Sequence, residues 1–581
     1  MASESKNVKA LTPEQILERL DEQQRAAAES LLGPTVILAG AGTGKTRTVT
    51  HRIAYGIARG YYAPNRILAL TYTNRAAGEL RDRLRQMGIL GVSVKTFHAA
   101  ALSQLEYFWP QYAGVPAPQV MESKARFIAR AAETQGLMLD TVAVRELAGE
   151  IEWRKFSMLS LEEYAETAKS RPQVAGLSAS KNVAVQQAYE ELKTKEQRLD
   201  WEDVLVLCLG LLRAEPRALA HVQQQYRFFT VDEYQDISPL QHALLDEWLG
   251  DHSDLCVVGD PNQTIYSFTG ASAAFLQGFA SRFDGATVVE LTRNYRSTAP
   301  IVETANRLLR GVNSMAELES AVDGAAPQNE AENLPLLVKP RAFDSANDEL
   351  NWLAYSIRQR IEQGVPASEI AVLYRVNGQS EAIENALARQ NVEYQLRGGQ
   401  RFFARPEIMQ AMLALRAEAI SPSSKPLFQT VSDICRSLGW QTQAPEQAGP
   451  AREKWESLNA LLNILDELEP TATITDFVAE LDERHRSQHE PTKEAVTLST
   501  IHAAKGLEWQ VVYVLGLTEG YLPIAYAQSD AAIEEERRLL YVAITRARQA
   551  LSLSYSQRDI SGRPSAPSRF LRAIEPSQPI Q

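Results

Sequence analysis

The chain has 581 residues, which is enough sequence for roughly four domains of typical size. Hydrophobic residues make up 45% and charged residues 23%, a balance typical of globular proteins that excludes a chain disordered throughout. The formal net charge is −12, whereas proteins held on nucleic acid by a bulk electrostatic field tend to be basic, so any contact with nucleic acid has to be local.

Cysteine usage and the lack of long apolar runs favour an intracellular chain. Cys208, Cys256 and Cys435 lie far apart without a CxxC pair, so a disulfide framework, a zinc knuckle and a four-cysteine iron–sulfur cluster are not expected. Residues 1–9 are polar, unlike the apolar core of a signal peptide. No run reaches the ~18 apolar residues of a membrane span, so we expect a cytoplasmic protein that does not enter a membrane.

The first half of the chain alternates short β-rich runs with amphipathic helical patterns, which is typical of a parallel sheet covered by helices. Strands are expected at residues 35–39, 66–71, 227–231, 255–258 and 287–291. Residues 102–191 lack strand-like runs and are rich in Ala, Glu, Leu, Gln and Lys, so they predict a helical insertion.

The second half repeats this alternation of strand-like runs and helical patterns after residues 315–332, which are expected to form a loop or linker. A second strand–helix region begins near Leu334. Its strands are expected at residues 370–374, 495–500 and 511–515. Residues 420–491 carry Pro- and Ser-rich runs around short helical patterns and predict a second insertion, and the tail after Tyr555 is polar.

Together these sequence patterns predict an α/β fold of two parallel-sheet lobes, each interrupted by a mostly helical insertion. The expected bounds are 1–101 and 200–300 for the first lobe, 102–199 for its insertion, 301–419 and 495–581 for the second lobe with the C-terminal tail, and 420–494 for its short insertion.

A glycine-rich run follows the first expected strand and precedes a helical pattern. Glycines let backbone amides turn inward around phosphate oxygens, and the following helix N-terminus adds the positive end of its dipole. Lys45 would reach the β- and γ-phosphates, and the Thr46 hydroxyl would ligate Mg²⁺. The alternative, a flexible glycine turn, leaves the GKT ending unexplained. The predicted phosphate loop is Ala39 (where the consensus has Gly), Gly40, Ala41, Gly42, Thr43, Gly44, Lys45 and Thr46.

Two adjacent carboxylates end the expected strand at residues 227–231. Asp232 would face the metal ion, and Glu233 would face an attacking water. Taken alone, an Asp-Glu pair after a strand is equally well explained as a solvated loop. Together with the phosphate loop, the pair is interpreted as catalytic.

Ten runs, in one order, carry a resemblance to a known family. They are LDEQQRAA (20–27), AGAGTGKTR (39–47), LTYTNRAAGELRDRL (70–84), VKTFHAAAL (94–102), DEYQD (232–236), VVGDPNQTIYSFTGA (257–271), LTRNYRST (291–298), RGGQRFFARPEI (397–408), TLSTIHAAKGLEW (497–509) and EEERRLLYVAITRAR (534–548). On these runs the chain resembles superfamily 1 DNA helicases of the UvrD/Rep/PcrA family, with the two insertions and the tail weakly matched. The resemblance implies two RecA-like lobes of the phosphate-loop NTPase fold that use ATP and Mg²⁺.

The resemblance assigns four residues to the nucleoside. Gln24 would hydrogen-bond the adenine edge and Tyr295 would stack on its face, with Arg47 nearby. Glu508 would hold the ribose hydroxyl. An amide on one edge and an aromatic ring on one face would favour ATP over other triphosphates.

The resemblance also assigns residues to the phosphates. Gln263 would position water or sense the γ-phosphate, and Arg296 and Arg546 would be arginine fingers, typically worth on the order of 10³–10⁵ in rate. Arg546 lies in the second lobe, so the site would be complete only when the lobes close, which couples ATP hydrolysis to lobe motion. For the two arginines of the EEERR run (534–538), helix-surface pairs with its glutamates are the better interpretation.

A motor on single-stranded nucleic acid needs a sequence-tolerant grip, and stacking on aromatic rings supplies roughly 1–3 kcal/mol per base. Phe268 stands where many relatives carry Trp, and Phe97 is explained equally well as a core residue. The positions that contact single strands in similar helicases are matched by Tyr72, Asn74, Phe97, His98, Tyr266, Phe268 and His502, and the threonines that could contact phosphates without adding charge are Thr71, Thr73 and Thr96.

The resemblance implies an ATP hydrolase and 3′-to-5′ DNA helicase that moves along single-stranded DNA and unwinds tailed duplex DNA. Its setting would be repair, recombination or replication restart, with repair or replication proteins as partners. Two departures support tracking on DNA better than processive unwinding. The second insertion is much shorter than in well-studied relatives, and residues 556–568 hold no aromatic residue to match the pin of many relatives.

Three other functions stay open. A translocase would strip proteins from single strands and barely open duplex DNA. A helicase–nuclease subunit would need its nuclease in a partner, because only a short tail follows the last motif. A generic phosphate-loop ATPase acting on proteins or membranes would leave the aromatic-lined motifs unexplained. Strand displacement from 3′- and 5′-tailed duplexes separates the helicase from the translocase.

Overall fold

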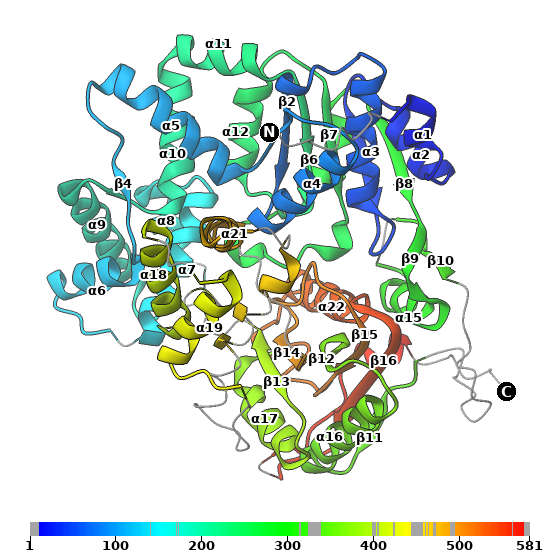
Figure 1. Cartoon of the computed structure of the whole chain (residues 1–581). Coiled ribbons are helices and arrows are strands. Elements are labelled where there is room, and N and C mark those ends of the chain that lie inside the picture. The colour runs from blue at the N-terminus through cyan, green and yellow to red at the C-terminus, as the bar shows by residue number, and fades with distance from the viewer. Residues whose placement is uncertain are drawn as a thin grey trace. The chain divides into compact units, whose positions relative to one another are not determined.

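The computed structural model divides the chain into two compact units, Met1–Thr292 and Arg293–Gln581, called unit 1 and unit 2 below (Figure 1). Each unit is described by itself. The described residues are 11–139, 141–169, 171, 174–312, 315–322, 338–397, 403, 406–421, 425–442, 457–458, 461–462, 464–468, 472–487, 494–560 and 562–574.

Unit 1 is built on a parallel sheet whose described strands follow the order β3-β2-β6-β7-β1-β8. Their bounds are β1 (Thr35–Ala39), β2 (Ile67–Thr71), β3 (Ser93–Thr96), β6 (Phe228–Val231), β7 (Leu255–Gly259) and β8 (Thr287–Leu291). Most of these strands are almost continuously apolar because helices cover both faces of a parallel sheet.

Successive residues of one strand enter two different hydrophobic cores of unit 1. Leu68 of β2 packs into one core and its neighbour Ala69 into the other, as the period of two in a strand requires.

The helices of unit 1 are α1 (Pro13–Leu17), α2 (Glu22–Glu29), α3 (Lys45–Ala58), α4 (Asn74–Gln86), α5 (Phe97–Ala113), α6 (Lys124–Thr134), α7 (Thr141–Phe156), α8 (Leu161–Thr167), α9 (Ala179–Glu196), α10 (Trp201–Ala214), α11 (Pro216–Gln225), α12 (Pro239–Leu249), α13 (Ala274–Gln277) and α14 (Phe279–Arg282).

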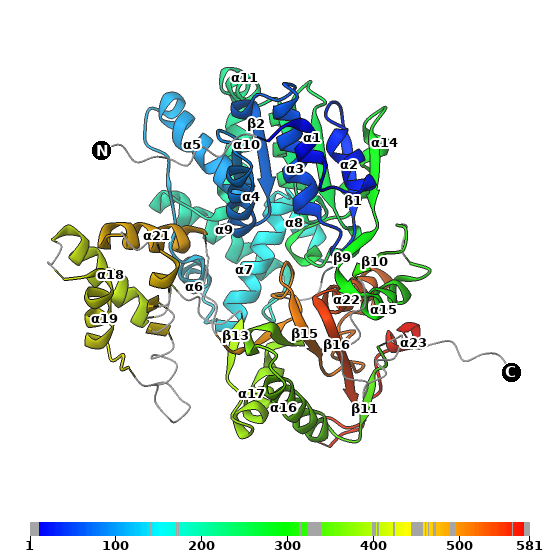
Figure 2. The ribbon, with the colours of Figure 1, turned by 45° about the vertical axis from the view of Figure 1, so that its right-hand side comes forward.

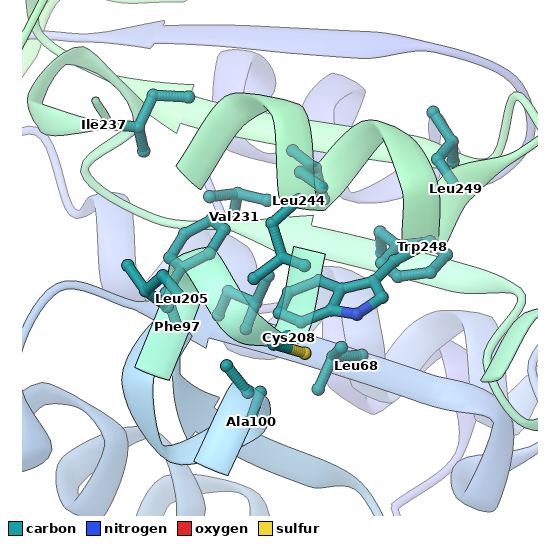
Figure 3. Packing of buried hydrophobic residues seen from close by; sticks show 14 of the residues in the cluster. Leu68, Phe97, Ala100, Leu205, Cys208, Val231, Ile237, Leu244, Trp248 and Leu249 are labelled. Atoms are coloured by element: carbon teal, nitrogen blue, oxygen red, sulfur yellow. The ribbon is translucent and has the colours of Figure 1, made fainter. Parts of the chain in front are cut away.

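Phe97, the first residue of α5, belongs to the first of these cores (Figure 3). It is 4% exposed, and its ring stacks on Trp248 of α12 with centroids 5.9 Å apart. A ring enclosed in this way has no face for a nucleobase. The core interpretation of Phe97 is confirmed, and its expected contact with DNA is corrected.

The helical insertion of unit 1 has a core of its own, in which α6, α7 and α9 bury residues such as Ile128 and Leu147. Two short parallel strands that the sequence texture missed, β4 (Gln119–Val120) and β5 (Arg198–Leu199), pair at its two ends. Helix α5 continues past residue 101 and packs into the core of the sheet as far as Phe108. The core of the lobe therefore extends beyond the expected start of the insertion.

Unit 2 holds a second parallel sheet, whose described strands follow the order β11-β16-β15-β12-β14-β13. Their bounds are β11 (Arg341–Phe343), β12 (Ile370–Tyr374), β13 (Tyr394–Arg397), β14 (Val496–Thr500), β15 (Trp509–Val514) and β16 (Ala547–Ser556), and a separate parallel pair is formed by β9 (Arg293–Thr298) and β10 (Glu319–Val322). This second sheet confirms the expected α/β fold of two parallel-sheet lobes.

The helices of unit 2 fall into two groups. Those that accompany the strands are α15 (Ala299–Leu309), α16 (Ala346–Glu362), α17 (Ser380–Arg389), α22 (Asp530–Ile544) and α23 (Leu571–Ile574). A second group, α18 (Pro406–Ile420), α19 (Leu427–Ser437) and α21 (Ile474–Ser487), shares a core of its own (Figure 2). This core begins before residue 420, where the second insertion was expected to start.

The eight strands expected from the sequence are all present, with ends shifted by two residues or fewer. Part of the stretch expected as a loop is instead β10, and residues 323–332 of that stretch lie outside the described residues. No helix in the described ranges combines the length and the apolar character needed to cross a membrane.

Candidate functional site

The phosphate loop connects β1 to α3 and has the backbone shape of an anion cradle. Gly42 and Gly44 have φ of 73° and 82°, in the left-handed region that favours glycine. A Cβ on Gly44 would lie 2.8 Å from Nε2 of Gln24, so a side chain here would displace the Gln24 amide. Gly44 is the N-cap of α3 and supplies no side-chain hydrogen bond, so no capping side chain competes with an anion for the amides of the first turn.

Lys45 starts α3 and reaches toward Glu233. Its Nζ lies 3.8 Å from Oε1 of Glu233, and the side chain is only 13% exposed. Nζ is buried and has no hydrogen-bond partner among the described residues. An ammonium group buried without a hydrogen bond is costly, and phosphate oxygens would supply the missing acceptors.

Asp232 and Glu233 follow β6 directly. The Asp232 amide donates to the Leu70 carbonyl (2.9 Å), which prolongs the sheet, and the Glu233 amide donates to Oδ1 of Asp232 (3.0 Å). Glu233 then has a φ of 54°, an uncommon left-handed conformation for a residue other than glycine. The chain thus turns sharply at the residue expected to face the attacking water.

The electrostatics of Asp232 fit a divalent cation. Burial, and then the charge of Glu233, raises the pKa of Asp232 above its ordinary value, with Lys45 opposing the shift. A cation would stabilise this ionised carboxylate, and the hydroxyl of Thr46 in the first turn of α3 is a second oxygen ligand that Mg²⁺ accepts. Within the described ranges, no three His, Cys, Asp or Glu side chains form a metal site, so phosphates or water would complete the coordination.

A chain of buried hydrogen bonds links Glu233 to Gln263. Nε2 of Gln263 donates to Oδ2 of Asp260 (2.8 Å), and the Asp260 amide donates to Oε1 of Gln235 (3.0 Å). Nε2 of Gln235 donates in turn to Oε2 of Glu233. Sequence reasoning nominated the two ends of this chain and missed Gln235 and Asp260, although both stand inside the DEYQD and GDPNQ runs.

Gln24 and Arg47 both lie against the phosphate loop. Gln24 of α2 is 2% exposed, and its Nε2 donates to the carbonyl of Thr43 (3.0 Å). The guanidinium of Arg47 donates to the carbonyl of Arg19. The residue expected to read the adenine edge is therefore fixed next to the phosphate cradle.

Unit 2 brings together the residues expected at the nucleotide from its own part of the chain. Nε of Arg296 pairs with Oε2 of Glu508 at 2.5 Å, and its Nη1 donates to the carbonyl of Thr545 (3.4 Å). The neighbouring Arg546 is 2% exposed, and its guanidinium donates to the carbonyls of Val542 and Leu507 and to the hydroxyl of Thr545. Tyr295 is 44% exposed, so its side chain is accessible from solvent.

Of the two arginines of the EEERR run, Arg537 makes the expected pair with a glutamate of the run. Nε of Arg537 donates to both carboxylate oxygens of Glu534, three residues earlier on α22. For Arg538, burial lowers the pKa, and Glu535 and Glu534 oppose that shift. The pair of Arg537 with Glu534 is confirmed, but the Arg537 side chain is only 20% exposed and its Nη1 also donates to the carbonyl of Leu308 (3.2 Å), so it is not a helix-surface contact alone.

Two of the expected base-binding rings meet in unit 1. Tyr72, which follows β2, and Tyr266, which follows β7, stack with centroids 5.7 Å apart and planes 10° from parallel. Tyr72 is 40% exposed. The side chain of Phe268 lies outside the described residues, and its backbone forms the short 3-10 turn Ser267–Thr269. Asn74 is the first residue of α4, directly after its cap Thr73.

His98 lies between two aromatic rings. Its imidazole meets the rings of Phe156 and Trp201 edge to face, with centroids 6.2 Å and 6.0 Å away. Burial lowers the pKa of His98 to about 4, and its Nε2 is buried with no partner among the described residues. Trp201, which starts α10, is 51% exposed and was missed by sequence reasoning, although a large aromatic residue directly after a helix cap was a visible signal.

The remaining expected contacts are placed as follows. In unit 2, burial and then Arg375 and Lys505 lower the pKa of His502 to about 4. Thr73 and Thr96 accept hydrogen bonds as helix caps, whereas the hydroxyl of Thr71 donates to the carbonyl of Thr73. Only the two capping hydroxyls therefore keep a proton for a phosphate oxygen.

Comparisons with known proteins place similar sequences over both units. The model of the UvrD/REP helicase N-terminal domain matches residues 20–284, and that of the UvrD-like helicase C-terminal domain matches residues 289–445 and 425–558. The chain is 43% identical to the ATP-dependent DNA helicase UvrD2 of Mycobacterium tuberculosis, over 98% of this chain and 83% of the relative. It is 30% identical to the ATP-dependent DNA helicase PcrA of Leuconostoc citreum (97% and 86%) and 29% identical to DNA helicase II of Escherichia coli (96% and 87%).

Proposed function

Because this chain belongs to the UvrD/REP helicase family, we propose that it hydrolyses ATP to move 3′-to-5′ along single-stranded DNA and to unwind tailed duplex DNA. Family membership makes the chain an ATP-dependent DNA helicase, and the proposal adds the direction, the strand that is tracked and a role in repair, recombination or replication restart. Repair or replication proteins would be its partners. Because ATP and DNA meet in the bacterial cytoplasm, that is the compartment we propose.

One observation supports this function above the others. The buried chain of hydrogen bonds from Glu233 ends at Gln263, and three residues later Tyr266 stacks on Tyr72. The group proposed to act on the attacking water and the rings proposed to hold bases are therefore joined through one short segment of unit 1. A generic phosphate-loop ATPase has no need of that connection.

The nucleotide half of the reaction is assigned to the phosphate loop and the residues around it. The loop amides and Lys45 would hold the β- and γ-phosphates, and Gln24 would hold the adenine edge. Thr46 and Asp232 would hold Mg²⁺, which neutralises phosphate charge as it develops. Glu233 would accept a proton from the attacking water, with Gln263 orienting that water.

Unit 2 would supply the positive charge and the ribose contact. Arg296 and Glu508 are both assigned to the nucleotide, yet they are bound to each other. We propose that ATP exchanges this ion pair for two contacts, the ribose hydroxyl on Glu508 and a phosphate oxygen on Arg296. Arg546 would follow by releasing the carbonyls that now hold it.

The proposed contacts with DNA use aromatic rings and uncharged hydrogen-bond donors. Stacking on Tyr72 and Tyr266 is insensitive to base identity, and Phe268, whose side chain lies outside the described residues, is proposed from the motif alone to bind bases as well. His98, His502 and Asn74 would hydrogen-bond or stack on the strand. Contacts of this kind do not need a positively charged protein, which agrees with the net charge of −12.

A translocase that displaces bound proteins and barely opens duplex DNA is the second candidate. The observation that favours it is a short loop closed by a bridge between Arg558 and Pro564, which presents the aliphatic Ile560, 60% exposed. The sequence offers no aromatic ring at residues 556–568. An aliphatic side chain has less stacking area against a base pair than an aromatic ring has.

Strand displacement decides between the two candidates. The full chain, with ATP and Mg²⁺, is given duplexes that carry either a 3′ or a 5′ single-stranded tail, and Lys45→Ala serves as the hydrolysis-deficient control. We expect displacement from the 3′ tail alone and none with Lys45→Ala. Displacement from neither tail, with poly-dT-stimulated ATP hydrolysis intact, supports the translocase. Displacement from the 5′ tail alone contradicts the proposed direction.

A further inference from the structure

Gln235 occupies the centre of the buried hydrogen-bond chain and has no role in the function proposed so far. Its side chain is fully buried. Its Nε2 donates to Oε2 of Glu233 and, at 3.3 Å, to Oδ2 of Asp236, while its Oε1 accepts from the Asp260 amide at 3.0 Å. One amide group thus contacts the catalytic carboxylate on one side and the backbone after β7 on the other.

The space around Gln235 is shaped for this side chain. A Cβ on Gly259, the last residue of β7, would lie 2.4 Å from Oε1 of Gln235, which is impossible without displacing the amide. The backbone of Glu233 is in the left-handed region, where a residue other than glycine persists only if its surroundings hold it. The hydrogen bond from Gln235 is one such restraint on Glu233.

We infer that Gln235 is a positioning residue that fixes the carboxylate of Glu233 toward the attacking water and ties it to the segment that carries Gln263 and Tyr266. This inference rests on the proposed function, because it deepens the assignment of Glu233. Gln235 touches neither phosphate nor base in this scheme. It acts by limiting the orientations of Glu233 and by making them depend on the backbone at Asp260.

A neutral amide is the group that suits this position. The amide nitrogen can donate to two carboxylates while the amide oxygen accepts from a backbone amide. A carboxylate in its place would keep only the acceptor and would repel Glu233 and Asp236. A thioether of similar length would fill the volume and make neither strong hydrogen bond.

The test compares Gln235→Met with wild type in steady-state ATP hydrolysis by the full chain, with and without saturating poly-dT. A misplaced catalytic group costs on the order of 10²-fold in rate, so we expect kcat with poly-dT to fall by about tenfold to a hundredfold. The KM for ATP and the binding of a fluorescent ATP analogue should stay close to wild type, because Gln235 acts on the chemical step and not on ground-state binding.

Two further variants keep the result interpretable. Gln235→Asn retains the amide but is one methylene shorter, so it cannot span both partners and should also lower kcat. Gln241→Met is the matched control, since Gln241 is a buried glutamine (7% exposed) whose side chain caps α12 and makes no contact with Glu233 in the described residues. It should lower thermal stability while leaving the kcat of the folded protein unchanged.

The outcomes separate the inference from the function beneath it. A wild-type enzyme stimulated by poly-dT, together with a folded Gln235→Met whose kcat is unchanged, overturns the role of Gln235 alone. A rise in KM with kcat preserved also overturns it, since the side chain would then contribute to nucleotide binding. If Gln235→Met does not fold, a normal kcat in Gln235→Asn overturns the inference instead. Wild type that ignores poly-dT contradicts the proposed function itself.

Discussion

Burial determines what the two nominated histidines can offer to a nucleic acid. The pKa of His98 and that of His502 are both lowered to about 4, chiefly by burial. Both imidazoles are therefore neutral at pH 7 and add no positive charge against phosphates. They can stack or form a hydrogen bond, which agrees with a grip that does not depend on net charge.

The low pKa of His98 predicts a dependence of stability on acid. The ordinary histidine pKa of 6.5 applies to the unfolded chain. Between pH 6.5 and about 4, His98 is therefore protonated in the unfolded state and still neutral in the folded state. Stability contributed by neutral His98 is thus present above pH 6.5 and is lost as the pH falls toward 4. Urea unfolding at pH 7.5 and pH 5 should show that His98→Gln loses less stability on acidification than wild type. Equal losses would show that His98 does not titrate in this way.

Stacking on Tyr266 predicts a measurable share of DNA affinity. Loss of one base–aromatic stack costs roughly 1–3 kcal/mol, so we expect Tyr266→Ala to weaken binding of poly-dT by about fivefold to 150-fold. Tyr266→Phe keeps the ring and should bind as wild type. Tyr61→Ala removes another exposed tyrosine, one with no ring contact in the described residues, and should have no effect. Fluorescence anisotropy measures all three, and normal binding by Tyr266→Ala would remove Tyr266 from the DNA surface.

The sequence predicts which residues of the proposed phosphate site lie near one another better than it predicts their orientation. Lys45, Glu233 and Gln263 stand in recognisable runs, and the structure connects them. The bridging role of Gln235 depends on how β6 and β7 align, which the sequence does not show. Phe97 follows a helix cap and could have pointed either way, so only the packing against Trp248 decides its place.

A buried cluster of charges joins the insertion of unit 1 to the helix that follows it. Nζ of Lys155, on α7, lies 2.6 Å from both Oδ2 of Asp200 and Oδ1 of Asp203, and Nζ of Lys193, on α9, lies 3.1 Å and 2.5 Å from the same two carboxylates. Asp200 caps α10. Burial opposes its ionisation, but the two lysines outweigh burial and hold the pKa of Asp200 well below its ordinary value.

Removal of one member of this cluster should be costly. Lys155→Met leaves buried carboxylates short of a counter-charge, and breaking a buried pair costs about 3–5 kcal/mol. The matched control is Lys169→Met, because the pair of Lys169 with Glu166 is exposed and is worth at most about 1 kcal/mol. Urea unfolding of the full chain measures both. A loss for Lys155→Met no larger than that for Lys169→Met would mean that the cluster does not stabilise the junction.

The loop around Ile560 gives a prediction that separates unwinding from tracking. If Ile560 wedges between the strands, Ile560→Ala should slow displacement from a 3′-tailed duplex, because less apolar area meets the base pair. Ile560→Phe should unwind at least as fast as wild type. Hydrolysis of ATP with poly-dT should be normal in both variants, since Ile560 is assigned neither to the binding of single-stranded DNA nor to the hydrolysis of ATP. Unchanged displacement by Ile560→Ala would exclude this loop as the wedge.

Several of the strands that the sequence missed are short or lack aliphatic residues. The strand β9, RNYRST, is polar throughout, and it is a strand because its backbone pairs with β10. The short β3, SVKT, lies at the sheet edge, where little apolar surface is needed. Buried runs such as IAVLY were found because both faces of their sheet are covered.

The sequence alone does not show which residues from distant parts of the chain lie together in space. The alternation of strand-like and helical patterns predicted two parallel-sheet lobes, and both are present. The ion pair between Arg296 and Glu508 joins residues of unit 2 that are far apart in sequence, and the motifs assigned each of them to the nucleotide separately. Their pairing suggests that ATP has to break one contact in unit 2 to make its own, which would make binding itself a trigger for movement.

The most direct test of this scheme is the steady-state rate of ATP hydrolysis by the purified full chain, measured with saturating poly-dT and without it. Lys45→Ala provides the background, because an enzyme without the phosphate-loop lysine should not turn over under either condition. We predict that poly-dT raises the rate of wild type well above its rate alone. Equal rates with and without poly-dT, each above the Lys45→Ala background, would contradict the coupling of ATP hydrolysis to a bound DNA strand.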